Sequence, residues 1–180
     1  LQKYFKNNKI KIVILVRDVL DMLGSMLNVC RRNAEFYINR QYELSDKSKV
    51  IFGKKEELSE IIMSRDSYIY TTLYSINHLI KEDTFKDYIF VEYNDLVSKP
   101  GSTLKNIYNF FDIKHFKHNF NNIKEFEING VKYDDSILGG KMHTVKTGKL
   151  ERQEYQVKVP QRVVDKYSGL EVWRKINNEK

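Results

Sequence analysis

The sequence predicts an α/β fold, because two strand-like segments are each followed by a helical pattern. The run Ile10–Val16 is short, apolar and rich in β-branched residues, which is typical of a buried strand in a parallel sheet. Tyr88–Tyr93 is a second strand candidate, and Ser98–Phe111 follows it with helical periodicity and a proline near its start. Since strands and helices alternate along the chain, we expect the two strands to lie parallel in one sheet.

The first helix is predicted to begin directly after the first strand. Asp18 is a favourable N-cap residue, and Asp21 lies in the first helical turn. Apolar side chains then recur at helical spacing and predict the buried face, which comprises Met22, Leu23, Met26, Leu27 and Cys30. With a single cysteine in the chain no internal disulfide forms, so Cys30 is interpreted as a core residue, which fits a reducing compartment.

The central part of the chain predicts a long helical region that packs on the core. Glu43–Lys55 is polar and is interpreted as a loop, which could line an acceptor site. Glu56–Lys81 has one apolar face and a break near Arg65, which predicts two helices. The apolar face comprises Leu58, Ile62, Ile69, Leu73, Ile76 and Ile80. The accompanying Tyr68, Tyr70 and Tyr74 are interpreted as packing residues rather than as a substrate platform.

The C-terminal third contains a hairpin, a long loop and a short helix. Asn129-Gly130 between Phe126–Ile128 and Val131–Tyr133 is a type I′ hairpin signal. Ser136–Val159 has the polar, glycine-containing composition of a loop that orders around a ligand, and Pro160 opens a short helix. Inward-facing residues of this last part are expected to be Val163, Val164, Tyr167, Leu170 and Trp173.

Composition indicates one domain over residues 1–180, with 41% hydrophobic residues and a formal net charge of +7. The charge favours an anionic ligand. A nucleic-acid-binding domain ranks low, because neither an aromatic-basic RNA motif nor a charged recognition helix is visible. His115 and His118 are interpreted as surface residues rather than metal ligands. No apolar run is long enough to cross a bilayer, and a cytoplasmic location is expected.

The stretch VRDVLDMLGSM places Arg17 at the carboxyl end of the first strand and Ser25 eight residues later, on the helix. Open α/β sheets bind ligands at this edge. A guanidinium offers a planar fork of donors that matches phosphate oxygens, and a hydroxyl offers one more. The pair therefore indicates an anion site. The alternative is that Arg17 pairs with a nearby aspartate while Ser25 faces solvent.

Three segments resemble the PAPS-dependent sulfotransferases. Lys11–Ser25 (KIVILVRDVLDMLGS) is similar to their 3′-phosphate-binding segment, which implies that Arg17 and Ser25 ligate the 3′-phosphate of 3′-phosphoadenosine 5′-phosphosulfate (PAPS). Ile89–Ile113 resembles their Tyr-Glu-Asp-Leu, proline and helix segment. That likeness implies that Tyr93 lies near the adenine, while Asn94 stands where glutamate is usual.

The third segment, His143–Lys149 (HTVKTGK), resembles the basic, glycine-containing loop that closes over the nucleotide in this family, although His143 stands at the expected arginine position. It implies nucleotide contacts by Lys146, Thr147, Gly148 and Lys149. The resemblance also implies a three-layer α/β/α, P-loop-NTPase-like fold with a mostly parallel central sheet, and PAPS as co-substrate without a metal ion.

The family's 5′-phosphosulfate loop and catalytic base precede the strand that matches Ile10–Val16, and no such loop is visible in Leu1–Lys9. We therefore expect an amino-terminally truncated domain whose catalytic residues lie upstream and which is inactive on its own. The implied reaction moves a sulfuryl group from PAPS to a hydroxyl or amine. Carbohydrate, protein tyrosine, lipid and small phenol acceptors all remain open. The polar surface and the resemblance to the carbohydrate-type branch of the family favour a glycan, by analogy. The alternative function is a non-catalytic nucleotide-binding or interaction module.

Overall fold

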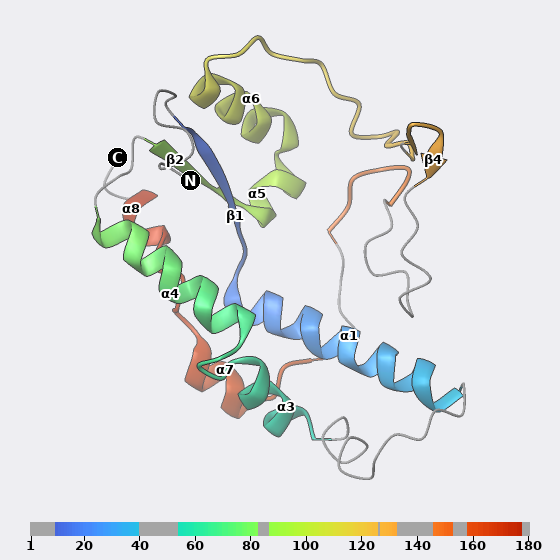
Figure 1. The fold of residues 1–180 in the computed structure, drawn as a ribbon, viewed down its shortest axis with the longest axis vertical. Helices are drawn as coiled ribbons and strands as arrows, with labels where there is room; N and C mark the ends of the chain where they lie inside the picture. The colour runs from blue at the N-terminus through green and yellow to red at the C-terminus, as the bar shows by residue number, and fades with distance from the viewer. Residues whose placement is uncertain are drawn as a thin grey trace.

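The computed structural model describes residues 10–39, 54–82, 87–125, 127–132, 146–152 and 158–177. Strands β1 (Ile12–Val16) and β2 (Tyr88–Glu92) pair in parallel, as the sequence predicts (Figure 1). The register aligns Ile12 with Tyr88 and Val16 with Glu92, so the carboxyl ends of both strands meet at one edge. Helices around a small parallel sheet confirm the α/β class. The full three-layer, P-loop-like architecture stays a prediction, since this sheet has two strands in the described residues.

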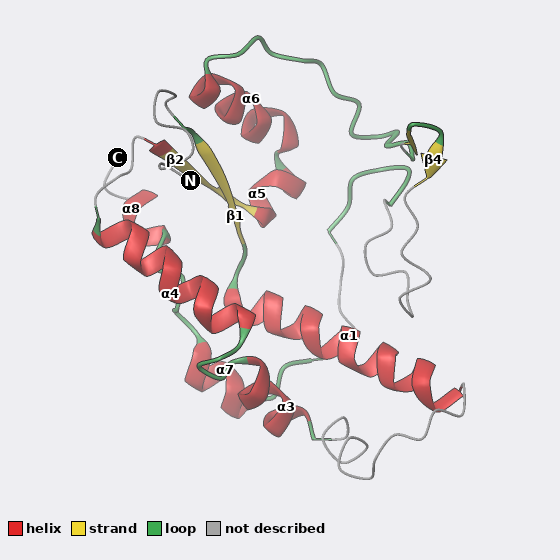
Figure 2. Cartoon of the chain, viewed as in Figure 1, coloured by secondary structure: helices red, strands yellow, loops and turns green. Residues whose placement is uncertain are grey.

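Helices surround the strand pair, with α5 and α6 on one side and α4 on the other (Figure 2). The order along the chain is the predicted one, with α6 beginning at its proline. The helices and their bounds are α1 (Val19–Asn39), α3 (Lys55–Ile62), α4 (Tyr68–Lys81), α5 (Tyr93–Ser98), α6 (Pro100–Phe111), α7 (Gln161–Tyr167) and α8 (Arg174–Asn177).

The break predicted near Arg65 is confirmed, because α3 ends at Ile62 and α4 begins at Tyr68. Ser67 caps α4, its hydroxyl accepting a hydrogen bond from the backbone N–H of Tyr70 at 3.1 Å. Helix α5, like the four-residue α8, was missed by the sequence patterns. The six residues of α5 begin directly after β2, and a helix that short offers too few turns for a periodic pattern.

A hydrophobic core joins β1, the start of α1 and the helices α3, α4 and α7. Partly buried side chains of both strands, Ile14 and Phe90, pack against it. The buried cluster comprises Val16, Val19, Leu23, Leu27, Leu58, Met63, Ile76, Val163 and Trp173. The predicted apolar face of Glu56–Lys81 therefore lies where it was expected.

Two predicted core residues are exposed instead. Met26 is 40% exposed and Leu170 is 37% exposed. On α1 the buried row runs through Val19, Leu23 and Leu27 at intervals of four, and Met26 lies about 100° around the helix from Leu27. Its side chain therefore falls outside the row that meets the core.

The tyrosines of α4 also correct the sequence interpretation, which took them as packing residues. Tyr68 is 91% exposed and Tyr74 is 66% exposed, while Tyr70 is exposed as well. The isoleucines and leucine of α4 occupy the side that faces the core, so little buried surface is left for the three rings. They lie at the surface of the protein.

The last part of the chain folds back onto the strand ends. We call Glu171, Trp173 and Arg174 the C-terminal clasp. The buried Glu171 carboxylate accepts a hydrogen bond from the backbone N–H of Val19 at 2.8 Å, which satisfies a free donor at the start of α1. Trp173 is buried as predicted and its Nε1 donates to Glu92 at 2.7 Å.

Arg174 completes the C-terminal clasp. Its Nε donates to the Glu92 carboxylate at 2.8 Å, and its guanidinium also reaches Asp18 at 3.4 Å. The hydrogen bond to Glu92, with smaller contributions from the neighbouring carboxylates, raises the pKa of Arg174. The clasp therefore joins the end of β2, the turn after β1 and the start of α1.

The predicted hairpin is confirmed, with β3 (Glu127–Ile128) and β4 (Val131–Lys132) pairing antiparallel. Asn129 and Gly130 have φ angles of 53° and 76°, and positive φ at both central residues is the signature of a type I′ turn.

Several predicted features lie outside the described residues. These are the amino-terminal segment 1–9, most of the loop predicted at 43–55, and His143 with much of the loop predicted at 136–159. Among the described helices, none combines the length and the apolar character that a membrane span requires.

We expect Leu23→Ala to lower the free energy of unfolding by about 2 to 5 kcal/mol, because it leaves a cavity in the core. Met26→Ala, on the exposed side of the same helix, is the matched control and should cost far less. Urea denaturation followed by far-UV circular dichroism measures both. Equal losses for the two variants would contradict the assignment of the buried row.

We expect Glu171→Ala to cost about 1 to 3 kcal/mol of stability, because it leaves the Val19 N–H buried without its acceptor. Glu82→Ala is the control, since Glu82 forms an exposed pair with His78 at 3.9 Å, and such pairs contribute about 0 to 1 kcal/mol. The same denaturation experiment measures the difference. A loss no larger than that of the control would show that the clasp does not hold the start of α1.

Candidate functional site

The candidate site begins with two residues that follow the paired strand ends. Val16 of β1 pairs with Glu92 of β2, so Arg17 and Tyr93 come next at the same edge of the sheet. The Arg17 guanidinium carbon lies 4.2 Å from the centre of the Tyr93 ring, which is a cation–π contact. The Arg17 side chain is only 16% exposed. The structure therefore brings together two residues separated by 76 positions in the sequence.

The turn from β1 into α1 gives Arg17 this position. The Asp18 carboxylate accepts hydrogen bonds from the N–H groups of Leu20 at 3.0 Å and Asp21 at 3.2 Å, which confirms the predicted cap. Arg17 Nε also lies 3.8 Å from the Asp21 carboxylate. The ion-pair alternative raised by the sequence is thus present, at a distance longer than a hydrogen bond.

Ser25 lies one helical turn beyond Asp21 on α1 and is half-buried. Residues four apart share a helix face, so Ser25 is on the side of α1 that carries Asp21. Asn28 and Arg32 continue the same face at intervals of three and four. This face therefore presents a serine, an amide and a guanidinium in succession beyond the Arg17–Asp21 pair.

The segment 146–152 approaches this face of α1 at two points. Arg152 donates a hydrogen bond to the Asp21 carboxylate at 2.8 Å. Burial first, and then the charge of Arg32 on the same face, lower the pKa of Lys146. The segment is therefore bonded to this face at Asp21, and Lys146 lies within electrostatic reach of Arg32.

Within this segment, Gly148 has a structural role. Its φ of 92° is a conformation that side-chain-bearing residues rarely adopt. Its N–H and C=O both pair with Ile123, at 2.8 and 2.7 Å, and Leu150 N–H donates to the Phe120 carbonyl at 2.8 Å. These bonds anchor the segment to residues 120–123, while the Thr147 side chain is exposed.

A pocket of about 470 Å³ lies between α5 and the same segment. Asn94, Val97 and Ser98 line it from α5, and 149–152 line it from the other side. In this pocket Lys149 pairs with Glu151 at 3.6 Å. The Asn94 Oδ1 atom is buried, and among the described residues it has no hydrogen-bond partner. Helix α5 and Arg152 are thus site features that the sequence analysis did not include.

The sequence contains only weak signals for Arg152 and for Asn94 of α5. Arg152 is a basic residue three positions after Lys149, which a wider reading of the basic loop would have included. Asn94 was noted only as a departure from the expected glutamate. The candidate site is therefore defined by Arg17, Ser25, Tyr93, Lys149 and Arg152, with Lys146 toward its far end. Cations predominate in it, which suits an anionic ligand.

Metal ligation finds no support in the part of the chain that the structure describes, where no group of three or more His, Cys, Asp or Glu side chains is close enough to hold an ion. His115 and His118 are exposed, and their rings contact Asn109 and Tyr108. Cys30 is a free, half-buried cysteine on α1, and burial raises the pKa of its thiol.

One of the comparisons with known proteins identifies a family. The family model described as the sulfotransferase domain matches residues 1–165, which is most of the 180-residue chain. None of the curated proteins compared with the chain matches it. The match spans both strands, Arg17, Tyr93 and the 146–152 segment, and by it the chain belongs to the sulfotransferase domain family.

Proposed function

We propose that this chain binds PAPS, and its product adenosine 3′,5′-bisphosphate, with the 3′-phosphate held by Arg17 and Ser25. The observation that carries the proposal is the Arg17 guanidinium, whose carbon lies over the Tyr93 ring, 4.2 Å from its centre, where two parallel strands end. Ligands bind at this edge in open α/β sheets. Membership of the sulfotransferase family supplies the general activity, which is sulfuryl transfer.

Stacking prepares Arg17 for an anion. The Arg17 guanidinium carbon lies over the Tyr93 ring, 4.2 Å from its centre, and a guanidinium carries its N–H donors in one plane, pointing outward from its edge. A phosphate in line with this edge receives two parallel charge-assisted hydrogen bonds. The Tyr93 ring also offers an aromatic surface close to the phosphate site, and an adenine has a complementary flat face.

The remaining cations of the site contribute the positive potential. Lys149 and Arg152 border the pocket beside α5, and Lys146 interacts with Arg32 further along α1. We propose that Lys146, Thr147, Gly148 and Lys149 lie over the bound nucleotide. The lowered pKa of Lys146 follows first from burial and then from Arg32, so a nearby phosphate would favour its charged form.

In the proposed reaction an acceptor oxygen or nitrogen forms a bond to the sulfur of PAPS. The bond from that sulfur to the bridging oxygen of the 5′-phosphate breaks, and adenosine 3′,5′-bisphosphate leaves. The acceptor proton passes to a general base. The residues of the candidate site bind and orient the donor. None of them is proposed as the general base. We propose a glycan as the acceptor.

A non-catalytic nucleotide-binding module would bind the same nucleotide without transferring sulfate. The discriminating experiment supplies PAPS carrying labelled sulfate together with glycan, phenol and amine acceptors, and measures the labelled product. Transfer restricted to glycans supports the proposed acceptor. Nucleotide binding without transfer to any of these acceptors supports the module.

We expect Arg17→Ala to weaken the binding of adenosine 3′,5′-bisphosphate by about 1.5 to 3 kcal/mol, the scale of a hydrogen bond to a charged group. Isothermal titration calorimetry measures it. Arg162→Ala is the matched control, because the Arg162 side chain on α7 is 86% exposed and outside the site. Adenosine 5′-monophosphate should bind both proteins equally. Equal binding of the bisphosphate to the Arg17 variant and the control would refute the assignment.

We expect Ser25→Ala to weaken the same binding by about 0.5 to 1.5 kcal/mol, because it removes one hydroxyl donor. Ser75→Ala is the control, since the Ser75 hydroxyl on α4 donates to the Thr71 carbonyl at 2.8 Å and is exposed. A titration of both variants under identical salt isolates the contribution of the hydroxyl. An unchanged dissociation constant for Ser25→Ala would leave Arg17 as the phosphate ligand and remove Ser25 from the site.

A further inference from the structure

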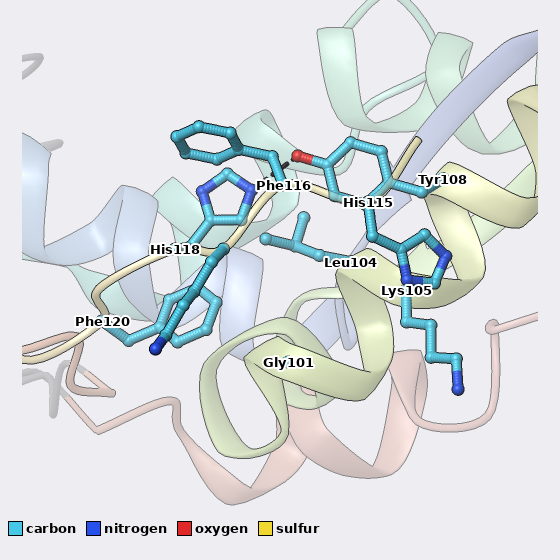
Figure 3. Close-up of a pocket in the computed structure, with 9 residues that line it drawn as sticks. Gly101, Leu104, Lys105, Tyr108, His115, Phe116, His118 and Phe120 are labelled. Atoms are coloured by element: carbon cyan, nitrogen blue, oxygen red, sulfur yellow. Dashed lines mark hydrogen bonds between the residues drawn. The ribbon is translucent and has the colours of Figure 1, made fainter. Parts of the chain in front are cut away.

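We propose that a second pocket, formed by α6 and residues 115–120, binds a small ring that carries one anionic group. The pocket has a volume of about 240 Å³ and includes none of the residues assigned to the nucleotide (Figure 3). Ligand pockets for drug-sized molecules are commonly about 300 to 1,000 Å³, so this one suits a single ring rather than a whole nucleotide. The inference does not depend on the nucleotide proposal.

The walls of this pocket are aromatic. His118 stacks on Tyr108 with ring centres 5.9 Å apart and on Phe120 at 5.8 Å. Phe116 meets His118 edge to face at 5.0 Å, and His115 lies 5.8 Å from Tyr108. With Leu104 between them, these rings form a flat-sided apolar surface (Figure 3).

The Tyr108 hydroxyl and the Nε2 atom of each histidine already have hydrogen-bond partners. Tyr108 Oη and His118 Nε2 are hydrogen-bonded at 2.5 Å, and His115 Nε2 donates to Asn109 Oδ1 at 2.9 Å. A nucleobase is recognised through donors and acceptors along its edge. Since the pocket offers mainly ring faces, it favours a ligand that packs by its own face, such as a sugar or a benzene ring.

Two lysines give the pocket its charge preference. Lys105 and Lys117 line it, and no acidic residue is among its lining residues. Lys105 extends beside His115 at the edge of the pocket (Figure 3). A lysine is a flexible point charge that reaches a sulfate or carboxylate without fixed geometry. An apolar wall with two cations at its margin is complementary to a ring that carries one negative group.

The exposure of Phe116 supports a binding role. Its side chain is 70% exposed, although the stack of Tyr108, His118 and Phe120 beside it could shelter a ring of this size. Phe120 is also hydrogen-bonded through its carbonyl to Leu150, so the segment that lines this pocket is tied to the one that approaches α1. Two classes of compound combine a ring with a sulfate group: sulfated sugars and aryl sulfates.

The experiment titrates the full chain with N-acetylglucosamine 6-sulfate and with 4-nitrophenyl sulfate. Nuclear magnetic resonance of the His115 and His118 ring protons gives the position and the affinity of binding. We expect both sets of signals to shift with at least one of these compounds. Whichever binds more tightly identifies the source of the ring. Inorganic sulfate and unsulfated N-acetylglucosamine should bind at least about tenfold more weakly.

Matched variants locate the contacts. Lys117→Gln and Lys105→Gln should each weaken the ring sulfate by about tenfold, as expected for one lost charge-assisted hydrogen bond, while Lys114→Gln, outside the pocket, should not. Phe116→Ala should weaken it as well, with Ile113→Ala as the exposed apolar control. Unchanged affinity in Arg17→Ala supports a site separate from the nucleotide.

Three results would overturn the proposal. The first is the absence of any shift at His115 and His118 with either ring sulfate. The second is binding of inorganic sulfate as tight as that of the ring compounds, which would indicate a plain anion site. The third is equal weakening by the pocket variants and by their neighbouring controls. None of these results bears on Arg17, so the nucleotide proposal is tested separately.

Discussion

The carboxylate of Glu92 is the point on which the arrangement of the strand ends depends. It accepts hydrogen bonds from Trp173 and Arg174, and Arg174 reaches on to Asp18. Glu92 is the last residue of β2 and Asp18 follows Arg17, so one guanidinium joins the two places where the strands give way to helices. With Glu171 capping α1, the C-terminal clasp keeps Arg17 and Tyr93 within stacking distance.

Much of the fold could be predicted from local patterns, because strand runs and helix periodicity are local properties. The two parallel strands, the break near Arg65 and the turn at Asn129 were predicted for that reason. The clasp could not be, since Val19 and Glu171 meet across 152 positions and no pattern signals such a contact. Met26 and the tyrosines of α4 were expected to pack against the core, but they are exposed. Helical periodicity identifies an apolar face, but it does not show how much of that face the neighbouring helices cover.

In the candidate site, too, local features could be predicted and long-range contacts could not. The resemblance pointed to Arg17 and Tyr93, and the structure brings them together because each follows a strand of the same parallel pair. Asn94 and the pocket beside it were not predicted, because they depend on α5 and on the return of 149–152 to the same edge. In a parallel pair, the residues that directly follow the two strands lie at the same edge of the sheet. A loop that comes back to this edge from another part of the chain has no comparable pattern in the sequence.

Asp21 explains how two guanidinium groups can lie near one another before any ligand arrives. Its carboxylate contacts Arg17 at 3.8 Å and Arg152 at 2.8 Å. The Asp21 carboxylate lies between the two arginines and limits the repulsion between them. Its contact with Arg152 is a hydrogen bond, whereas its contact with Arg17 is longer than one. The bond to Arg152 holds the 146–152 segment at α1, beside the residues proposed to bind the phosphate.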